Sequence, residues 1–202
     1  MDVIVTHGNT DFDAFAAMLA ARRLYPGAVV ALSGSLNRNV RDFYRLHAEA
    51  LDVAEQGRVD LDGIERLIVV ETSHPARLGD FERVARDPKV EVVLFDHHGD
   101  EKLDWVRPEN VVRSDDGALT TTMVSILAER ELDVTPLEAT VFALGIHEDT
   151  GSLSYAGVSL RDAEALAWCL RHGASQDMVA QYLHAPLSQA ERGLLDALLA
   201  AA

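Results

Sequence analysis

Several features that would assign this chain to a special class of protein are scarce or missing. Cysteine occurs once, so no internal disulfide can form and nothing in the sequence requires an oxidising compartment. That residue, Cys169, lies in a helical run and is expected to pack in the core. No apolar run approaches the roughly 18 residues that a membrane-spanning helix needs, and no charged-then-apolar leader precedes the first strand. These absences predict a cytoplasmic protein that does not associate with membranes.

Positive charge is scarce as well. Lysine and arginine together number 18 against 33 aspartates and glutamates, which gives a formal net charge of −15. A chain this acidic repels a polyphosphate backbone, so long duplex DNA is a poor partner. The objection is weaker for a short phosphorylated nucleotide, because bound divalent cations would neutralise several clustered carboxylates and invert the local potential. The charge therefore fits a site that holds cations.

The apolar pattern alternates between strand and helix periods, which is typical of a doubly wound α/β protein. Strands are predicted at 2–6, 28–32, 66–71 and 90–95. Helices are predicted at 12–24, 38–51, 79–86, 118–131, 136–147, 160–172, 175–183 and 187–201. Thr10 is the predicted cap of the first helix. The last two strands have continuous apolar runs, as expected for parallel strands that are covered on both faces.

This organisation predicts a single domain. With 202 residues, 48% of them hydrophobic, the chain can bury one large core. We predict one catalytic domain over 1–202, in which a mainly parallel sheet flanked by helices (about 1–115) is followed by a helical C-terminal subregion (about 117–202).

Polar side chains follow three of the predicted strands at the point where each strand ends. They are His7, Asp11 and Asp13 after the first strand, Glu71 after the third, and Asp96, His97 and His98 after the fourth. The carboxyl ends of parallel strands meet at one edge, where open α/β sheets keep their sites. Imidazole mixed with carboxylate favours Mn²⁺, Fe²⁺, Co²⁺ or Zn²⁺ over Ca²⁺. Together the three clusters predict a polynuclear metal centre.

Each cluster also has a structural interpretation. In the first, the two aspartates can complement the dipole at the start of a helix. In the last, one histidine can cap the following helix while the other is solvated. A fourth cluster, Glu148 and Asp149 after the helix at 136–147, is by itself an ordinary helix ending. It gains meaning only in combination with the other three.

Taken in order along the chain, the four clusters resemble the DHH phosphoesterase superfamily. That superfamily includes RecJ-type exonucleases, family II inorganic pyrophosphatases, oligoribonuclease-phosphatases and cyclic-dinucleotide phosphodiesterases. The resemblance covers roughly residues 1–155 and rests on 6–14, the strand that ends at Glu71, 95–98 and 148–151. Residues 24–28, 149–153 and 161–163 are most similar to the DHH domains that precede CBS domains and a poly(A)-polymerase-like nucleotidyltransferase module in large bacterial proteins.

The resemblance implies a pair of Mn²⁺ ions, with Mg²⁺ or Co²⁺ as substitutes. It implies that His7 and Asp11 bind one ion, that Asp13, His97 and Asp149 bind the other, and that Glu71 bridges the two. Asp96 would orient a ligand histidine, and His98 would contact the substrate phosphate. Two such ions lower the pKa of a shared water and stabilise charge on the phosphoryl oxygens. The implied activity is hydrolysis of phosphoester bonds in short nucleotides, either oligoribonucleotides or cyclic dinucleotides.

Two departures from the family pattern support an alternative function. The family has aspartate where this chain has Glu71, so the bridging carboxylate is one methylene longer. Unless the backbone retreats, we expect a weakly held second ion, which Glu71→Asp would strengthen. The family also carries a smaller C-terminal lobe that grips the substrate, and we expect that lobe to be absent here. The alternative is therefore a catalytically weak or silent nucleotide-binding or regulatory module of a larger protein.

The last predicted helix bears an apolar stripe, formed by Leu187, Ala190, Leu194, Leu195, Leu198 and Leu199. We expect this stripe to pack on the helical subregion with some residual exposure. The exposed part would support a homodimer or contact with the missing lobe.

Four further features are given structural rather than catalytic roles. Thr120, Thr121 and Thr122 could present hydroxyls to a phosphate at a helix start, but helix capping and solvation are expected instead. Arg77 could reach the substrate, but a surface ion pair is expected, and His147 and His184 are expected to be surface or packing histidines.

Overall fold

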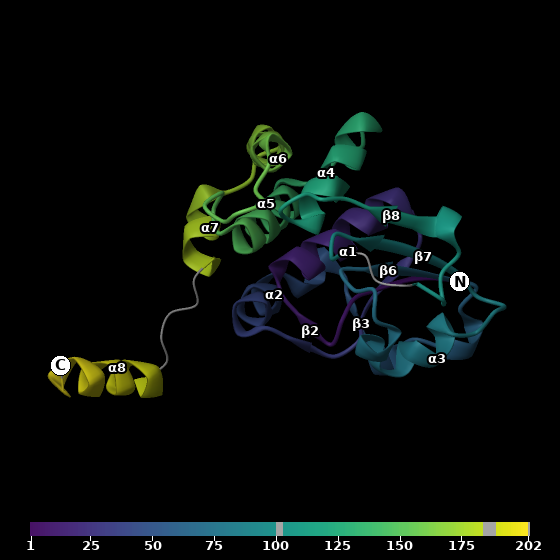
Figure 1. Cartoon of the computed structure of the whole chain (residues 1–202), viewed down its shortest axis with the longest axis horizontal. Coiled ribbons are helices and arrows are strands. Elements are labelled where there is room, and N and C mark those ends of the chain that lie inside the picture. Colours follow the sequence, from purple (N-terminus) through teal and green to yellow (C-terminus); the bar gives the residue numbers. More distant parts are fainter. Residues whose placement is uncertain (100–102, 184–188, 202) are drawn as a thin grey trace.

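The computed structural model describes residues 1–99, 103–183 and 189–201 of the chain. Within them, the main sheet has six parallel strands in the order β5-β3-β1-β6-β7-β8 (Figure 1). The strands are β1 (Asp2–Val5), β3 (Val29–Leu32), β5 (Ala54–Glu55), β6 (Arg66–Val70), β7 (Glu91–Asp96) and β8 (Val111–Arg113). A second sheet pairs β2 (Asn9–Thr10) with β4 (Ser35–Leu36). The strand order reverses between β1 and β6, which is where α/β sheets of this kind bind ligands.

Helices cover both faces of the main sheet, as the sequence predicts. The helices of the described residues are α1 (Phe12–Leu24), α2 (Arg38–Leu51), α3 (Glu82–Ala85), α4 (Leu119–Glu129), α5 (Pro136–Thr150), α6 (Leu160–Arg171), α7 (Gln176–Tyr182) and α8 (Gln189–Ala201). One core joins Ile4 and Ile68 of the sheet to α1, α2, α4 and α5. The other core joins Val3 and Leu67 to α3 and the preceding 3₁₀ helix η3 (Pro75–Phe81).

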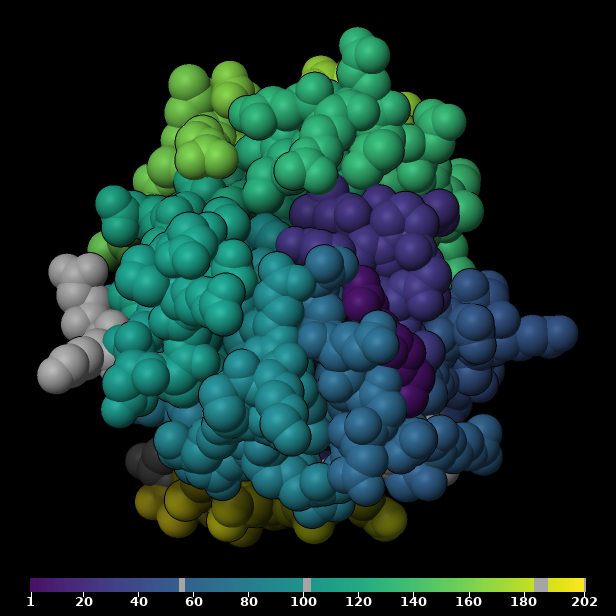
Figure 2. Space-filling view, turned by 90° about the vertical axis from the view of Figure 1, so that its right-hand side faces the viewer, coloured from purple at the N-terminus to yellow at the C-terminus, as the bar shows by residue number. Residues whose placement is uncertain are grey.

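The N-terminus lies at the edge of the sheet opposite to the one that carries the predicted metal ligands. The terminal amino group of Met1 donates to the Gly63 carbonyl at 2.8 Å, at the amino ends of β1 and β6. Figure 2 shows this side of the molecule. Because the strands are parallel, their carboxyl ends and the loops that follow them lie at the opposite edge of the sheet.

Gly145 allows α1, α4 and α5 to approach one another closely. A Cβ atom at this position would lie 2.7 Å from Thr120 Oγ1 and 3.0 Å from the Phe12 carbonyl oxygen. Any larger residue would therefore push apart the first turns of α1 and α4. Both of these turns carry backbone and side-chain groups of the candidate site, so the close packing of the helical subregion sets the geometry of that site.

Two local predictions are wrong. Asp11, not Thr10, is the N-cap of α1: its Oδ1 accepts from the Ala14 amide at 3.0 Å. The Thr10 hydroxyl instead donates to the His7 carbonyl. The helix predicted at 79–86 is α-helical only over α3, and residues 79–81 belong to the 3₁₀ helix η3. Gly79 has a non-helical φ of 58° and interrupts the segment there.

The predicted packing of the last helix is also wrong. None of the described residues of α8 is buried, and Leu194, Leu195, Leu198 and Leu199 are between 43% and 68% exposed. Figure 1 shows α8 standing apart from the other helices. Leu187 lies outside the described residues. Association through this stripe, with a second copy or with another lobe, stays a prediction. No helix in the described part of the chain is long and apolar enough to cross a membrane.

Candidate metal centre

Four of the predicted ligands meet at the carboxyl edge of the sheet. They are Asp13 in the first turn of α1, Glu71 after β6, His97 after β7 and Asp149 near the end of α5. Each offers one ligand atom, and all four atoms lie within 4.8 Å of one another. His97 Nε2 lies 3.0 Å from Glu71 Oε1, 3.5 Å from Asp149 Oδ2 and 4.0 Å from Asp13 Oδ2. We refer to these four residues as the metal cluster.

The metal cluster crowds three carboxylates into a buried space. Burial, followed by the Asp13 charge, raises the pKa of Glu71 well above its ordinary value and that of Asp149 to about 8. Burial would lower the pKa of His97, but its hydrogen bond with Glu71 and that group's charge raise it to about 10. All three pKa values are raised, so each group favours a bound proton or another positive charge in this space.

The donor set fits a divalent cation. Three carboxylates with one imidazole suit Mn²⁺ and its neighbours in the first transition series. Glu71 Oε2 is buried and has no hydrogen-bond partner, which is costly unless a proton or a cation satisfies it. The side chains present therefore match the chemistry of a metal site, although the individual ligand assignments stay predictions.

His7 and Asp11 lie beside the metal cluster as a second pair of candidate ligands. His7 Nε2 is 3.8 Å from Asp11 Oδ2. Burial lowers the pKa of His7 and so favours the neutral imidazole that a metal requires. Because Asp11 also caps α1, its structural and metal-binding interpretations are compatible: one carboxylate oxygen serves the helix and the other faces His7.

The carboxylate of Asp13 is held in place by the start of α4. Its two oxygens accept from the amides of Leu119 at 2.8 Å and Thr120 at 2.9 Å. This contact joins residues far apart in the chain and places the positive end of a helix dipole on a metal-cluster carboxylate. Burial nevertheless raises the pKa of Asp13, because desolvation outweighs these hydrogen bonds.

The two neighbouring histidines are held by different partners. His97 Nδ1 contacts the Asp116 carbonyl oxygen at 3.1 Å, which leaves Nε2 to face the metal cluster. Asp96 instead contacts His98, accepting from its amide at 3.1 Å and bonding its Nδ1 at 2.8 Å. Asp96 was predicted to orient a ligand histidine, and the histidine that it holds is His98. Burial would raise the pKa of Asp96, but the His98 contacts keep it below its ordinary value.

Two acidic residues near the site have positions that the sequence analysis missed. Asp116 supplies the carbonyl that holds His97, and its carboxylate accepts from Thr122 Oγ1 at 2.6 Å and pairs with Arg161 at 3.3 Å. Glu148 Oε2 accepts from the Phe12 amide at 2.6 Å. No sequence signal identifies the partner of a backbone carbonyl or amide. The adjacency of Glu148 to Asp149 was the only available hint.

The residues that the sequence assigned to structural rather than catalytic roles agree with those predictions only in part. Thr120, Thr121 and Thr122 are buried rather than solvated, and the hydroxyl of Thr121 donates to Asp162 at 2.6 Å. His147 is half-buried, with an Nδ1 that lacks a partner. His184 lies outside the described residues. Arg77 forms no ion pair with any carboxylate in the described part of the chain, so the ion pair predicted for it is wrong.

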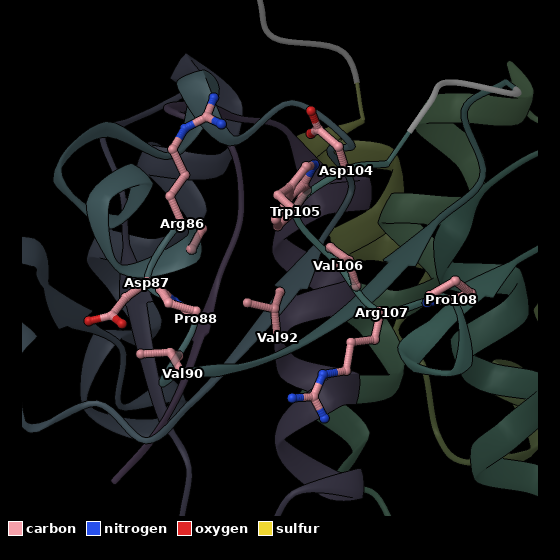
Figure 3. Close-up of a pocket in the computed structure, with 11 residues that line it drawn as sticks. Arg86, Asp87, Pro88, Val90, Val92, Asp104, Trp105, Val106, Arg107 and Pro108 are labelled. Atoms are coloured by element: carbon pink, nitrogen blue, oxygen red, sulfur yellow. The ribbon is translucent and has the colours of Figure 1, made fainter.

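A separate cavity lies away from the metal cluster, between the α3–β7 connection and residues 104–108. Its volume is about 570 Å³, and Trp105, Arg86 and Arg107 are among the residues that line it (Figure 3). Figure 3 shows the two guanidinium groups pointing to different sides of the cavity, so they do not converge on a common anion. No residue of the metal cluster contributes to its lining.

The length of Glu71 provides the first testable prediction. Its φ is 64°, in the left-handed region, and its carboxylate reaches His97 at 3.0 Å. Two ligands about 2.1 Å from one ion and at right angles are roughly 3 Å apart, so the glutamate already reaches a ligand position. Glu71→Asp should therefore stop about 1.5 Å short and bind divalent metal at least roughly tenfold more weakly.

Metal titration of both proteins by calorimetry would measure this loss. The direction is opposite to the expectation from side-chain length alone, because side-chain length does not show where the backbone of residue 71 lies. Higher metal occupancy in Glu71→Asp than in the unmodified protein would restore the sequence-based expectation.

Comparison with known proteins agrees with this geometry. The family model described as DHH family, N-terminal domain, matches residues 3–146. An A-adding tRNA nucleotidyltransferase of Geobacter sulfurreducens is 40% identical over 200 residues, 98% of this chain and 23% of that protein. One of Aquifex aeolicus is 31% identical over 175 residues, 86% of this chain and 20% of that protein. The chain thus spans less than a quarter of either relative.

Solved structures support the fold. An exopolyphosphatase-related protein from Bacteroides fragilis superimposes with a TM-score of 0.75 at 15% identity, covering 98% of this chain and 60% of its own. A candidate family II inorganic pyrophosphatase from Methanococcus jannaschii superimposes with a TM-score of 0.68 at 17% identity, covering 88% of this chain and 58% of its own. At these identities the likeness is one of fold.

Proposed function

Because this chain belongs to the DHH family, we propose that it is a metal-dependent hydrolase of phosphoester bonds in short nucleotides, with Mn²⁺ as its preferred ion. The observation that carries the proposal is the metal cluster, in which three carboxylates and one imidazole converge around a buried, unpartnered oxygen of Glu71. Burying three carboxylates at the point where the strand order reverses destabilises the metal-free protein. A bound cation would offset that destabilisation.

In this proposal each side chain has a defined task. Asp13, Glu71, His97 and Asp149 would hold one cation, and His7 with Asp11 would hold a second. When bound, the two cations would supply a more acidic water and neutralise charge on the phosphoryl group. The Asp13 carboxylate is kept from rotating by the α4 amides, and His97 is kept in one orientation by the Asp116 carbonyl.

His98 is suited to contact the substrate. Its side chain is 54% exposed, and Asp96 binds its Nδ1, which leaves Nε2 as the ring atom available to a phosphoryl oxygen. Both ring nitrogens of a protonated imidazole donate, so with Nδ1 held by Asp96 the Nε2–H can donate to a phosphoryl oxygen. We therefore assign His98 the role of donor to the substrate phosphate.

The alternative function is a weak or silent nucleotide-binding or regulatory module of a larger protein. In the sequence, the departure of Glu71 from the aspartate of the family pattern favours this alternative, whereas the position of its carboxylate 3.0 Å from His97 does not. The relatives named A-adding tRNA nucleotidyltransferases are more than four times as long as the segment they share with this chain, and an acidic module of this kind could regulate such a protein. Metal binding without turnover is the outcome that distinguishes the alternative.

An activity assay with metal exchange tests the proposal. Protein freed of metal by a chelator should be reloaded with Mn²⁺, Mg²⁺ or Co²⁺ and given a 5′-phosphorylated diribonucleotide, a cyclic dinucleotide, inorganic polyphosphate and a generic aryl phosphodiester. We expect hydrolysis of the nucleotides that depends on metal and is fastest with Mn²⁺. His98→Asn should bind metal normally and hydrolyse slowly, whereas exposed Glu164→Gln should match the unmodified protein. Bound metal with no hydrolysis of any substrate would favour the regulatory module.

A further inference from the structure

Arg77 lies beside the first metal-binding loop although it comes from a different part of the chain. It belongs to η3, which follows the loop after β6. Its carbonyl oxygen accepts from the Gly8 amide at 3.0 Å, and Gly8 is the residue next to His7. The backbone of Arg77 is therefore pinned at the carboxyl edge of the sheet, next to the proposed ligands His7 and Asp11.

The guanidinium group of Arg77 has no acidic partner. Many other arginines have a side-chain nitrogen within 4.0 Å of a carboxylate oxygen, among them Arg22, Arg23, Arg66, Arg83, Arg86 and Arg161. Arg77 is exposed and makes no such pair with any described residue, although its backbone lies beside the loop that carries His7 and Asp11. The positive charge of Arg77 acts on the His7 ring, more weakly than the negative charge of Asp11 does.

This placement is unfavourable for a metal site by itself. A fixed positive charge near a ligand histidine repels a bound cation. The same charge becomes favourable once an anion bridges it to the metal, because a guanidinium group presents paired N–H donors that match phosphate oxygens. Arg77 is therefore placed for a complex of metal and anion rather than for the metal alone.

We propose that Arg77 binds a phosphate oxygen of the substrate on the His7–Asp11 side of the metal cluster. This inference rests on the proposed function, and it adds a specific phosphate-binding residue to it. Other arginines near the site are engaged: Arg161 pairs with the Asp116 carboxylate at 3.3 Å, and Arg113 donates to the Gly99 carbonyl.

The test measures two affinities in Arg77→Gln that should move in opposite directions. Binding of inorganic phosphate to the Mn²⁺-loaded protein, followed by calorimetry, should weaken roughly ten- to hundredfold, as expected for a lost hydrogen-bonded ion pair. Binding of Mn²⁺ to the metal-free protein should be unchanged or a few-fold tighter, because a repelling charge has been removed. Arg77→Lys should fall between, since an ammonium group keeps the charge but loses the paired geometry.

Arg107→Gln is the matched control, because Arg107 is an exposed arginine of the cavity that lies away from the metal cluster. It should change neither affinity. Equal phosphate affinity in Arg77→Gln and the unmodified protein would overturn the inference. So would weaker Mn²⁺ binding in Arg77→Gln, which would indicate a structural role, or a Mn²⁺-loaded unmodified protein that binds no phosphate.

The two proposals fail in different ways. If no phosphoester is hydrolysed with any metal but Arg77→Gln loses phosphate affinity, the proposed function fails and the arginine site stands. If nucleotides are hydrolysed, Arg77→Gln should raise KM more than it lowers kcat. If both KM and phosphate affinity are unchanged in Arg77→Gln, the proposed hydrolase function stands, but Arg77 does not contact the substrate.

Discussion

Asp149→Asn is expected to lower phosphoester hydrolysis by about three orders of magnitude, because each metal contributes several kcal/mol of transition-state stabilisation. Asparagine has nearly the shape of aspartate but is a much weaker metal ligand. Asp149 Oδ2 lies 3.5 Å from His97 Nε2, so the substitution removes one of the converging oxygens without removing packing. Bound metal per protein, measured by elemental analysis, should fall together with the rate.

The stability of the metal-free protein provides an internal control for Asp149→Asn. Burial, with the charges of Asp13 and Asp11, raises the pKa of Asp149 to about 8. A carboxyl group with a raised folded-state pKa binds more protons when folded, so its ionisation costs stability as pH rises from about 4 towards about 8. Metal-free Asp149→Asn should therefore equal the unmodified protein at low pH and exceed it near pH 8. A variant that is less stable at every pH would show that activity was lost through unfolding.

Glu138→Ala is expected to lower the free energy of unfolding by about 3–5 kcal/mol, the usual effect of removing one partner of a buried ion pair. Glu138 is 3% exposed and accepts from Arg23 Nε at 2.9 Å and from Arg22 at 3.4 Å. It also completes a capping box at the start of α5, where its carboxylate accepts from the Thr135 amide at 2.9 Å. The substitution would leave Arg22 and Arg23 without this carboxylate and remove one half of the capping box, while the Thr135 hydroxyl still accepts from the amide of residue 138. Urea denaturation would measure the loss.

A matched substitution and a pH series test the cause of this effect. Exposed Glu129→Ala should change the unfolding free energy by less than about 0.5 kcal/mol. Burial would raise the pKa of Glu138, but its bonds from Arg23 and Thr135 hold it below the ordinary value. The stabilisation is therefore present above the unfolded pKa, about 4.3, and is lost as pH falls through the folded pKa. A difference between Glu138→Gln and the unmodified protein that does not shrink as pH falls below about 4.3 would contradict an ionic origin.

The repeating pattern of the sequence was sufficient to predict most of the secondary structure. The predicted bounds 12–24 and 38–51 agree with α1 and α2, and all four predicted strands occur in the main sheet. These elements have long apolar repeats and clear breaks, such as the turn that starts at Tyr25 after α1. The short strands β2, β4, β5 and β8 were missed, because two or three residues are too few to show a period.

The site was predictable in its composition but not in its contacts. Polar residues at the ends of parallel strands identified His7, Glu71 and His97, since the topology brings those ends to one edge. The partner of each polar group depends on which chain segment packs beside it. For this reason the contacts of Asp116 with His97 and of Glu148 with the start of α1 were invisible before the structure.

By itself the sequence determined the order of strands and helices, the acidic character and the group of residues that can bind metal. These properties follow from local composition and from periods of two and 3.6 residues. Only the tertiary structure decided that Asp11 rather than Thr10 caps α1, that Asp96 holds His98, that Glu71 reaches its position with a left-handed backbone, and that α8 leaves its leucines exposed. The Asp11 and Asp96 contacts join residues only three and two positions apart, but they depend on a backbone geometry that the sequence pattern does not specify. The position of α8 depends on how whole elements pack.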